Sequence, residues 1–150
     1  MNHLPVNRLD ESSLHNAYAF LETVFTHEQQ IPKELIPLKF EEQFWWYIQS
    51  DGRIVGTAAA WKDGKEWHWG RLAVSVHQRG KGLGKKLAVQ SFGDLFQMDI
   101  QEIIIDARDV TVKLLQSIGA EITGRTTEFY GIPITPMTLK KEDFDGFQSN

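Results

Sequence analysis

The sequence has no cysteine among its 150 residues, which excludes disulfide bridges, thiolate catalysis and cysteine-ligated metal sites. It has no apolar run near the roughly 20 residues that cross a bilayer. Positive charge is not in excess, because the formal net charge is −4, so a general nucleic-acid surface is not expected. The first residues, MNHLP, lack the basic and apolar regions of a signal peptide. These absences favour a cytoplasmic protein without a membrane or nucleic-acid partner.

What is present suits a folded enzyme-sized domain. The hydrophobic content of 41% and the length predict a single domain over residues 1–150 with a sizeable core. Residues 140–150 are mostly polar, and we expect them to form a frayed tail. The five histidines show no paired metal-ligand spacing, so the sequence predicts no metal site.

Local patterns predict a mixed α/β fold. Residues 4–9 suit a short edge strand, and apolar residues from Leu14 to Phe25 recur at helical spacing. Tight turns at Asp51-Gly52 and Asp63-Gly64 then separate three strands in an antiparallel meander. The predicted strands are residues 44–48, 53–61 and 66–74.

The second half predicts a parallel crossover. An amphipathic helix over residues 83–98 precedes a buried strand over residues 102–107, which therefore runs parallel to strand 66–74. Asp109 is the expected N-cap of the next helix, and Gly119 is expected to end it. Residues 120–139 read as a C-terminal β pair.

Residues 72–87 organise the chain, because here a strand becomes a glycine-rich turn and then a helix. Gly80, Gly82 and Gly84 allow a tight turn and a close approach of a ligand. The helix that follows presents unpaired N–H groups, which favour phosphate. Positive charge gathers at the same place, on Arg79, Lys81, Lys85 and Lys86. The spacing fits neither a mononucleotide P-loop nor G-x-G-x-x-G, but it fits R-x-x-G-x-G. We therefore expect a cofactor that carries a pyrophosphate.

This loop resembles the acyl-CoA pyrophosphate loop of the GNAT superfamily of N-acetyltransferases, and the order of elements over residues 6–139 is similar to the GNAT fold. Other stretches are similar to the ElaA-like branch of the family: Val24-Phe25, Glu28-Gln29, Ile31-Pro32, Gly70 to Val74, and Phe129 to Pro133 with Met137. The resemblance implies direct transfer of an acetyl group, within a ternary complex, from acetyl-CoA to a primary amine of a small molecule or a protein. Polyamine, aminoglycoside, amino acid and protein amine all stay open as acceptors, as do the monomer and the homodimer.

The resemblance also implies a cofactor site. The main chain of Leu72, Val74 and Val76 would hydrogen-bond the pantetheine arm as if the arm were an added strand, and amides from Arg79 to Gly84 would hold the pyrophosphate. The implied cofactor-binding residues are Leu72, Val74, Val76, Arg79, Gly80, Lys81, Gly82, Leu83, Gly84 and Lys85. An N–H near Leu72 would polarise the thioester carbonyl. The cleft for the thioester would be opened by a bulge between the strand that ends at Val74 and the strand around Ile104.

The sequence departs from the family at the usual general acid, because Leu114-Leu115 stands where many members have Phe-Tyr. A CoA thiol with a pKa of about 8.5 can leave as the thiolate without that acid. Arg108 stands where Asn or Gln is common; it would stabilise the thiolate or pair with a neighbouring aspartate.

The amine, with a pKa of about 10.4, needs a base. Glu28 is the first candidate. Glu66 and His68 are alternatives because they share one face of the predicted strand 66–74, which leads to the cofactor loop. Tyr130 is a candidate substitute acid or substrate wall. Two rival functions stay open. One is a non-catalytic acyl-CoA-binding domain, and the other is a nucleic-acid-binding module that uses residues 79–86.

Overall fold

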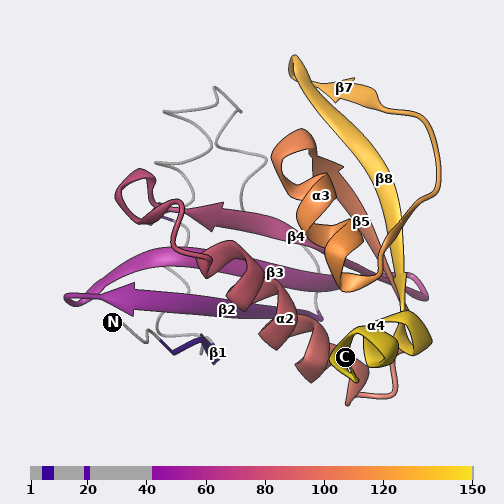
Figure 1. The fold of residues 1–150 in the computed structure, drawn as a ribbon, viewed down its shortest axis with the longest axis horizontal. Helices are drawn as coiled ribbons and strands as arrows, with labels where there is room; N and C mark the ends of the chain where they lie inside the picture. The colour runs from indigo at the N-terminus through magenta and orange to yellow at the C-terminus, as the bar shows by residue number, and fades with distance from the viewer. Residues whose placement is uncertain (1–4, 9–18, 21–41, 150) are drawn as a thin grey trace.

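The computed structural model describes residues 5–8, 19–20 and 42–149, and within these ranges one mixed sheet carries three α-helices (Figure 1). The strands are β1 (Asn7–Arg8), β2 (Gln43–Ser50), β3 (Arg53–Asp63), β4 (Glu66–Val74), β5 (Glu102–Arg108), β6 (Glu121–Ile122), β7 (Thr127–Phe129) and β8 (Ile132–Lys140). The helices are α2 (Leu83–Phe96), α3 (Asp109–Ile118) and α4 (Lys141–Gln148), with a 3-10 turn, η3 (Val76–Gln78).

Strands β2, β3 and β4 form the predicted antiparallel meander. Its first turn has Asp51 at φ 53° and Gly52 at φ 77°, which are the two positive φ values that a type I′ turn requires. The second turn starts at Gly64, with φ 64°. Strand β1 pairs with the outer side of β2, so the expected edge strand is present at Asn7–Arg8.

The parallel crossover is also confirmed, because β4 continues through α2 into β5 and the two strands pair in parallel. The strand order is β1-β2-β3-β4-β5-β8-β6, and β7 pairs with β8. The expected C-terminal β pair is therefore a group of three strands, since both β6 and β7 pair with the long strand β8. The fold class predicted from the sequence is correct.

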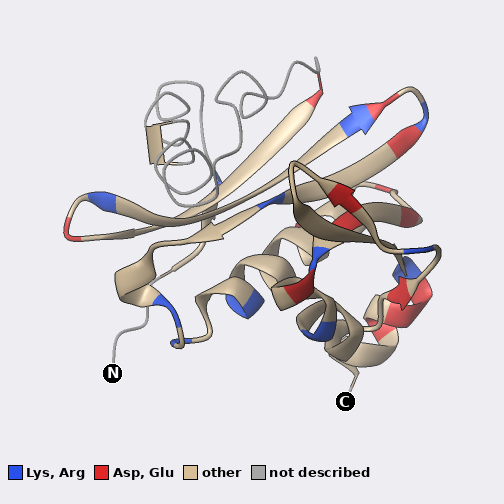
Figure 2. Ribbon diagram, turned by 90° about the horizontal axis from the view of Figure 1, so that it is seen from above, with Lys and Arg blue, Asp and Glu red and all other residues tan. Residues whose placement is uncertain are grey.

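Helices α2, α3 and α4 lie on the same face of the sheet (Figure 2). Two tryptophans anchor α2 to this face, because Trp69 Nε1 donates to Ser91 Oγ at 2.8 Å and Trp46 Nε1 donates to Asp94 Oδ2 at 2.8 Å. Both indoles belong to the hydrophobic core. A buried indole needs such an acceptor for its N–H, so these two bonds set the rotation of α2 on the sheet.

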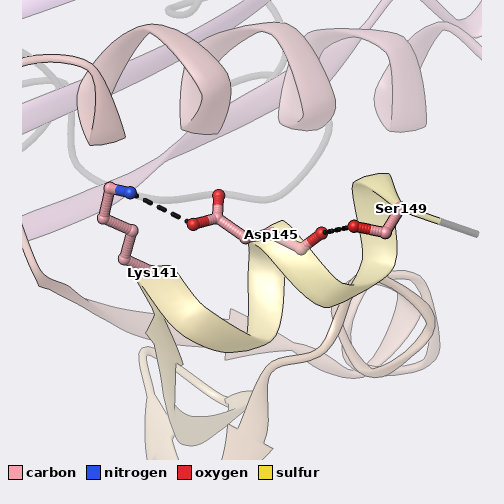
Figure 3. A network of polar contacts seen from close by, with 3 residues as sticks. All are labelled: Lys141, Asp145 and Ser149. Carbon is pink, nitrogen blue, oxygen red and sulfur yellow. Dashed lines mark hydrogen bonds and ion pairs between the residues drawn. The ribbon is translucent and has the colours of Figure 1, made fainter.

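The prediction of a frayed tail was wrong, because residues after Lys140 form α4. Phe144 is only 3% exposed, and its ring centroid lies 5.4 Å from that of Phe96. Lys141 Nζ and Asp145 Oδ2 are 3.1 Å apart on the exposed side (Figure 3). The burial of one phenylalanine thus docks a helix whose composition is otherwise polar.

The expected helix boundaries need one further correction, at the start of α3. Arg108 is the N-cap and Asp109 is the first helical residue, so Asp109 does not cap the helix with its side chain. Its carboxylate still lies in the first turn, where the helix dipole favours negative charge. Gly119 ends α3 as predicted, in the left-handed conformation with φ 116°.

Candidate active site

Strand β4 contains a bulge at Arg71 and Leu72. Thr57 pairs with Ala73 and Ala59 pairs with Gly70, so these two residues oppose Ala58 alone. Arg71 has φ 54°, a left-handed conformation that is uncommon outside glycine. Thr57 Oγ1 donates a hydrogen bond to the Arg71 carbonyl at 3.1 Å. The register shift lies in the ladder between β4 and β3, whereas the predicted bulge was placed between β4 and β5.

The bulge coincides with the point at which β4 and β5 separate. These strands pair only from Trp67 opposite Ile103 to Trp69 opposite Ile105. Beyond Trp69 a pocket of about 310 Å³ opens between them. Its lining is Trp61, His68, Trp69, Gly70, Arg71, Leu72, Ile105, Asp106, Ala107, Arg108, Thr111, Phe129 and Ile134. The expected gap between the two strands therefore exists and is large enough for a small molecule.

The pocket is lined from both faces of the sheet. Successive side chains of a strand point to opposite faces, and Trp69 points to the helix face because it bonds Ser91 of α2. Ile105 and Ala107 of β5 belong to the core on that face. Asp106 and Arg108 alternate with them and so point to the opposite face. The pocket thus connects the helix face with the opposite face.

The glycine-rich loop leads into α2, which lies on the helix face of the sheet. Gly80 and Gly82 have φ 83° and 77°, and a Cβ on either would meet no atom within 4 Å. Gly82 is the N-cap of α2, so no side chain covers the first N–H groups of the helix. A Cβ on Gly84 would lie 3.8 Å from Leu72 and 3.9 Å from Leu114, which joins the loop to β4 and α3. The loop is open to a ligand, and its Gly84 lies next to Leu72 of the pocket lining.

The cations of the loop are exposed but partly held by neighbours. Arg79 Nε donates to the Val74 carbonyl at 3.0 Å, so that carbonyl, which the resemblance assigns to the pantetheine arm, already accepts one bond. Lys81 Nζ donates to the Gln78 side chain at 3.2 Å, and Lys85 Nζ lies 5.7 Å from the Phe147 ring centroid. The loop holds positive charge close to the open amides.

The structure distinguishes the two candidate bases on β4. His68 lines the pocket, and its ring stacks on Trp61 at 5.9 Å with an interplanar angle of 10°. Its Nε2 atom is buried and has no hydrogen-bond partner in the part of the chain that the structure describes. Glu66 is exposed at the turn beside Asp63 and does not line this pocket. Of the pair, His68 has the position from which it could accept a proton.

The other three catalytic candidates have different outcomes. Tyr130 lies in the β7–β8 turn with φ 51° and is 58% exposed, and its ring packs on Phe129, which is the member of the pair that lines the pocket. Glu28 lies outside the described residues. Leu72 follows Arg71 in the bulge and lines the pocket, and its main-chain role stays a prediction.

Sequence reasoning missed several residues of the lining. Thr111 lines the pocket from the first turn of α3, four residues before the fully buried Leu115. The i, i+4 spacing could have suggested it, because residues four apart share one face of a helix. Asp106 and Trp61 had no local signal, because their place in the pocket depends on strand order.

Two findings concern other kinds of site. Among the described residues, no group of three His, Cys, Asp or Glu side chains could hold a metal ion. None of the helices in the described part of the chain has the length and apolar character to span a membrane.

Comparison with known proteins identifies the family. Residues 10–141 match the family described as the acetyltransferase (GNAT) domain. The chain belongs to the GNAT acetyltransferase family. That match covers most of the chain, and the sheet with its one parallel pair and three helices in the described ranges is the fold of this family. No curated protein matched the sequence.

Solved GNAT structures share this fold at low sequence identity. ElaA of Escherichia coli has a TM-score of 0.82 at 19% identity, covering 92% of this chain and all of that chain, which agrees with the expected ElaA-like branch. An acyl-CoA N-acyltransferase from Pseudomonas aeruginosa has a TM-score of 0.78 at 16% identity, covering 91% of this chain and 99% of that chain. The CoA-dependent acyl-homoserine lactone synthase BjaI, solved with SAM and isopentyl-CoA, has a TM-score of 0.77 at 11% identity, covering 98% of this chain and 89% of that chain. Identities this low establish the fold alone.

Proposed function

We propose that the protein transfers an acetyl group from acetyl-CoA to a primary amine by direct attack in a ternary complex. One observation carries the proposal: Leu72 lines the gap that opens after Trp69 between β4 and β5, and it also lies next to Gly84 of the open glycine loop at the start of α2. A gap lined from both faces of a sheet can receive a donor from one face and an acceptor from the other. Membership of the GNAT family supports the same reaction class.

The donor would bind on the helix face. Amides from Arg79 to Gly84 would hold the pyrophosphate, since the helix N-terminus and the loop cations favour its charge. The main chain of Leu72, Val74 and Val76 would bind the pantetheine arm, and Lys85 would add positive charge nearby. The fit is good because Gly80 and Gly82 have open space where side chains would stand.

The chemistry would take place at the bulge. Acetyl-CoA supplies a thioester whose acyl carbon accepts the electron pair of the amine, so that a C–N bond forms and the C–S bond breaks. The N–H at Leu72 would stabilise negative charge on the carbonyl oxygen. His68 would take the proton that the amine loses, with Glu28 as the alternative base. Thr111, which lines the pocket, would donate to the departing sulfur.

Gly82→Glu tests the proposal directly. The left-handed φ of 77° strains any side chain there, and a carboxylate in the loop would repel the pyrophosphate. We expect the wild-type protein to release CoA thiol and form an N-acetylated product with at least one amine of a broad panel. We expect the variant to lose both CoA binding, measured by calorimetry, and turnover.

The matched control is Gly93→Ala on α2, where a Cβ would meet no atom within 4 Å. It should bind CoA as the wild type does. Unchanged CoA affinity in Gly82→Glu would reject the loop assignment. Tight binding by the wild type with no transfer to any amine would instead support a non-catalytic acyl-CoA-binding domain.

A further inference from the structure

The acceptor side of the pocket has a distinctive set of side chains. Asp106 and Arg108 of β5 lie on the face opposite the helices and line the pocket. Arg71 of the bulge also lines the pocket, and its guanidinium carbon lies 5.6 Å from the Trp61 ring centroid. This described wall therefore carries two guanidinium groups and one carboxylate beside the imidazole of His68.

We propose that the acceptor amine carries a carboxylate, as an amino acid does, and that Arg71 and Arg108 recognise that carboxylate. The inference rests on the proposed function and narrows its substrate class. Guanidinium presents paired N–H donors that match the two oxygens of a carboxylate. Arg71 and Arg108 belong to the two strands that separate, so a carboxylate held between them lies at the mouth of the gap.

Asp106 supplies the complementary group for the ammonium. It lies two residues from Arg108 on the same face of β5, which separates their Cα atoms by about 6.6 Å along the strand. An amino acid holds its ammonium and carboxylate close together, so one molecule can contact both side chains. The carboxylate of Asp106 binds the ammonium until His68 removes its proton.

The remainder of the wall is apolar. The Trp61 indole and the Phe129 and Ile134 side chains line the pocket around these charges. Trp61 is held in place, because its ring covers Gly70 and stacks on His68. Aromatic surface of this kind favours an apolar side chain on the acceptor. The ligand class is therefore an amino acid with an apolar side chain.

The experiment uses matched amines with acetyl-CoA. Each of several apolar amino acids, such as phenylalanine and leucine, is compared with its carboxamide and with the amine that lacks the carboxyl group. We expect kcat/KM to be at least about tenfold higher for the carboxylate form, since charged hydrogen bonds contribute that much or more. The carboxamide keeps the shape but has a lower amine pKa, because the nearby negative charge is gone. The two forms are therefore compared at a pH high enough for both amines to be neutral, so that the remaining difference reports the negative charge.

Variants assign the preference to the two arginines. Arg108→Gln and Arg71→Gln should each reduce the ratio of kcat/KM for the carboxylate to kcat/KM for the carboxamide by about tenfold. Lys113→Gln on the exposed side of α3 is the control and should keep the wild-type ratio. Equal rates for carboxylate and carboxamide in the wild type, or a ratio that survives both arginine variants, would overturn the inference.

Binding separates this inference from the proposed function. Calorimetry of the same amines with the CoA-saturated protein should show the carboxylate form binding at least about tenfold more tightly than the carboxamide. If no amine is acetylated but this binding preference is found, the proposed function fails and the inferred ligand class stands. If amines are acetylated at rates that do not depend on the carboxylate, the proposed function stands and the inferred ligand class fails.

Discussion

Gly70 shows how one absent side chain shapes the pocket. Trp61 has a ring carbon 3.0 Å from the place where a Cβ on Gly70 would stand, so the indole lies directly over β4. The same indole stacks on His68 and lies beside the Arg71 guanidinium. A side chain at residue 70 would move the indole and, with it, both neighbours. The positions of a candidate base and a candidate specificity residue thus depend on this glycine.

His68→Gln tests the proposed base. We expect kcat for the best amine to fall by about 10²-fold or more, because general bases contribute roughly 10²–10⁴-fold. The KM for acetyl-CoA should stay at the wild-type value, since His68 lies on the acceptor side of the pocket. Stopped-flow or steady-state thiol release measures both. Glu66→Gln on the same strand face is the control, and an equal loss in both variants would contradict the assignment.

At the scale of elements, the short polar helix α4 supports the sheet from its C-terminal end. Phe144 packs between Phe92 and Phe96 of α2, with ring centroids 6.2 Å and 5.4 Å away. A Cβ on Gly119 would meet the Asp143 carbonyl oxygen at 3.0 Å, which shows how closely α4 follows the end of α3. The helix therefore links α2 to α3, the two elements that flank the cofactor loop.

Phe144→Ala should lower the free energy of unfolding by about 3–5 kcal/mol, because it leaves a cavity against α2. Urea unfolding followed by circular dichroism measures this change. Asp145→Asn removes only the exposed ion pair with Lys141, and we expect a loss below about 0.5 kcal/mol. Equal losses for the two variants would mean that α4 is not docked through Phe144.

At the scale of the whole molecule, a net negative protein concentrates positive charge where an anion would bind. The formal net charge is −4, yet four Lys and Arg residues lie between residues 79 and 86. Such a local contrast attracts a compact anion more than an extended polyanion, because the rest of the surface repels a polymer. The arrangement favours a cofactor with a few phosphates over a nucleic acid.

CoA should therefore stabilise the folded protein. At a concentration of about 100 times Kd, binding adds about 2.7 kcal/mol and raises Tm by roughly 5–10 °C. Scanning calorimetry with and without CoA measures the shift, which should shrink at high salt because the charge interactions are screened. The strain of a side chain at φ 77° should lower the Tm of unliganded Gly82→Glu somewhat, and CoA should not shift that Tm. If CoA does not change the Tm of the wild-type protein, the proposed donor site is contradicted.

The sequence by itself determined the local elements and their order. Asp51-Gly52 and Gly119 set backbone conformations that few residues adopt, and the apolar run at residues 103–105 required a strand covered on both faces, so the meander and the parallel crossover were predictable. The open glycine loop was predictable for the same reason. Phe144 was misjudged, because one apolar residue in a polar stretch does not reveal which surface it covers.

Only the tertiary structure decided which side chains meet in the pocket. Glu66 and His68 are equivalent by strand alternation, and the structure separates them because β4 and β5 part beyond Trp69, close to His68 and away from Glu66. Asp106, Arg108 and Arg71 come together across two strands whose pairing is non-local. The physical reason is that turns and periodicity act through neighbouring residues, whereas a pocket is formed by strand register and by the bulge that interrupts it.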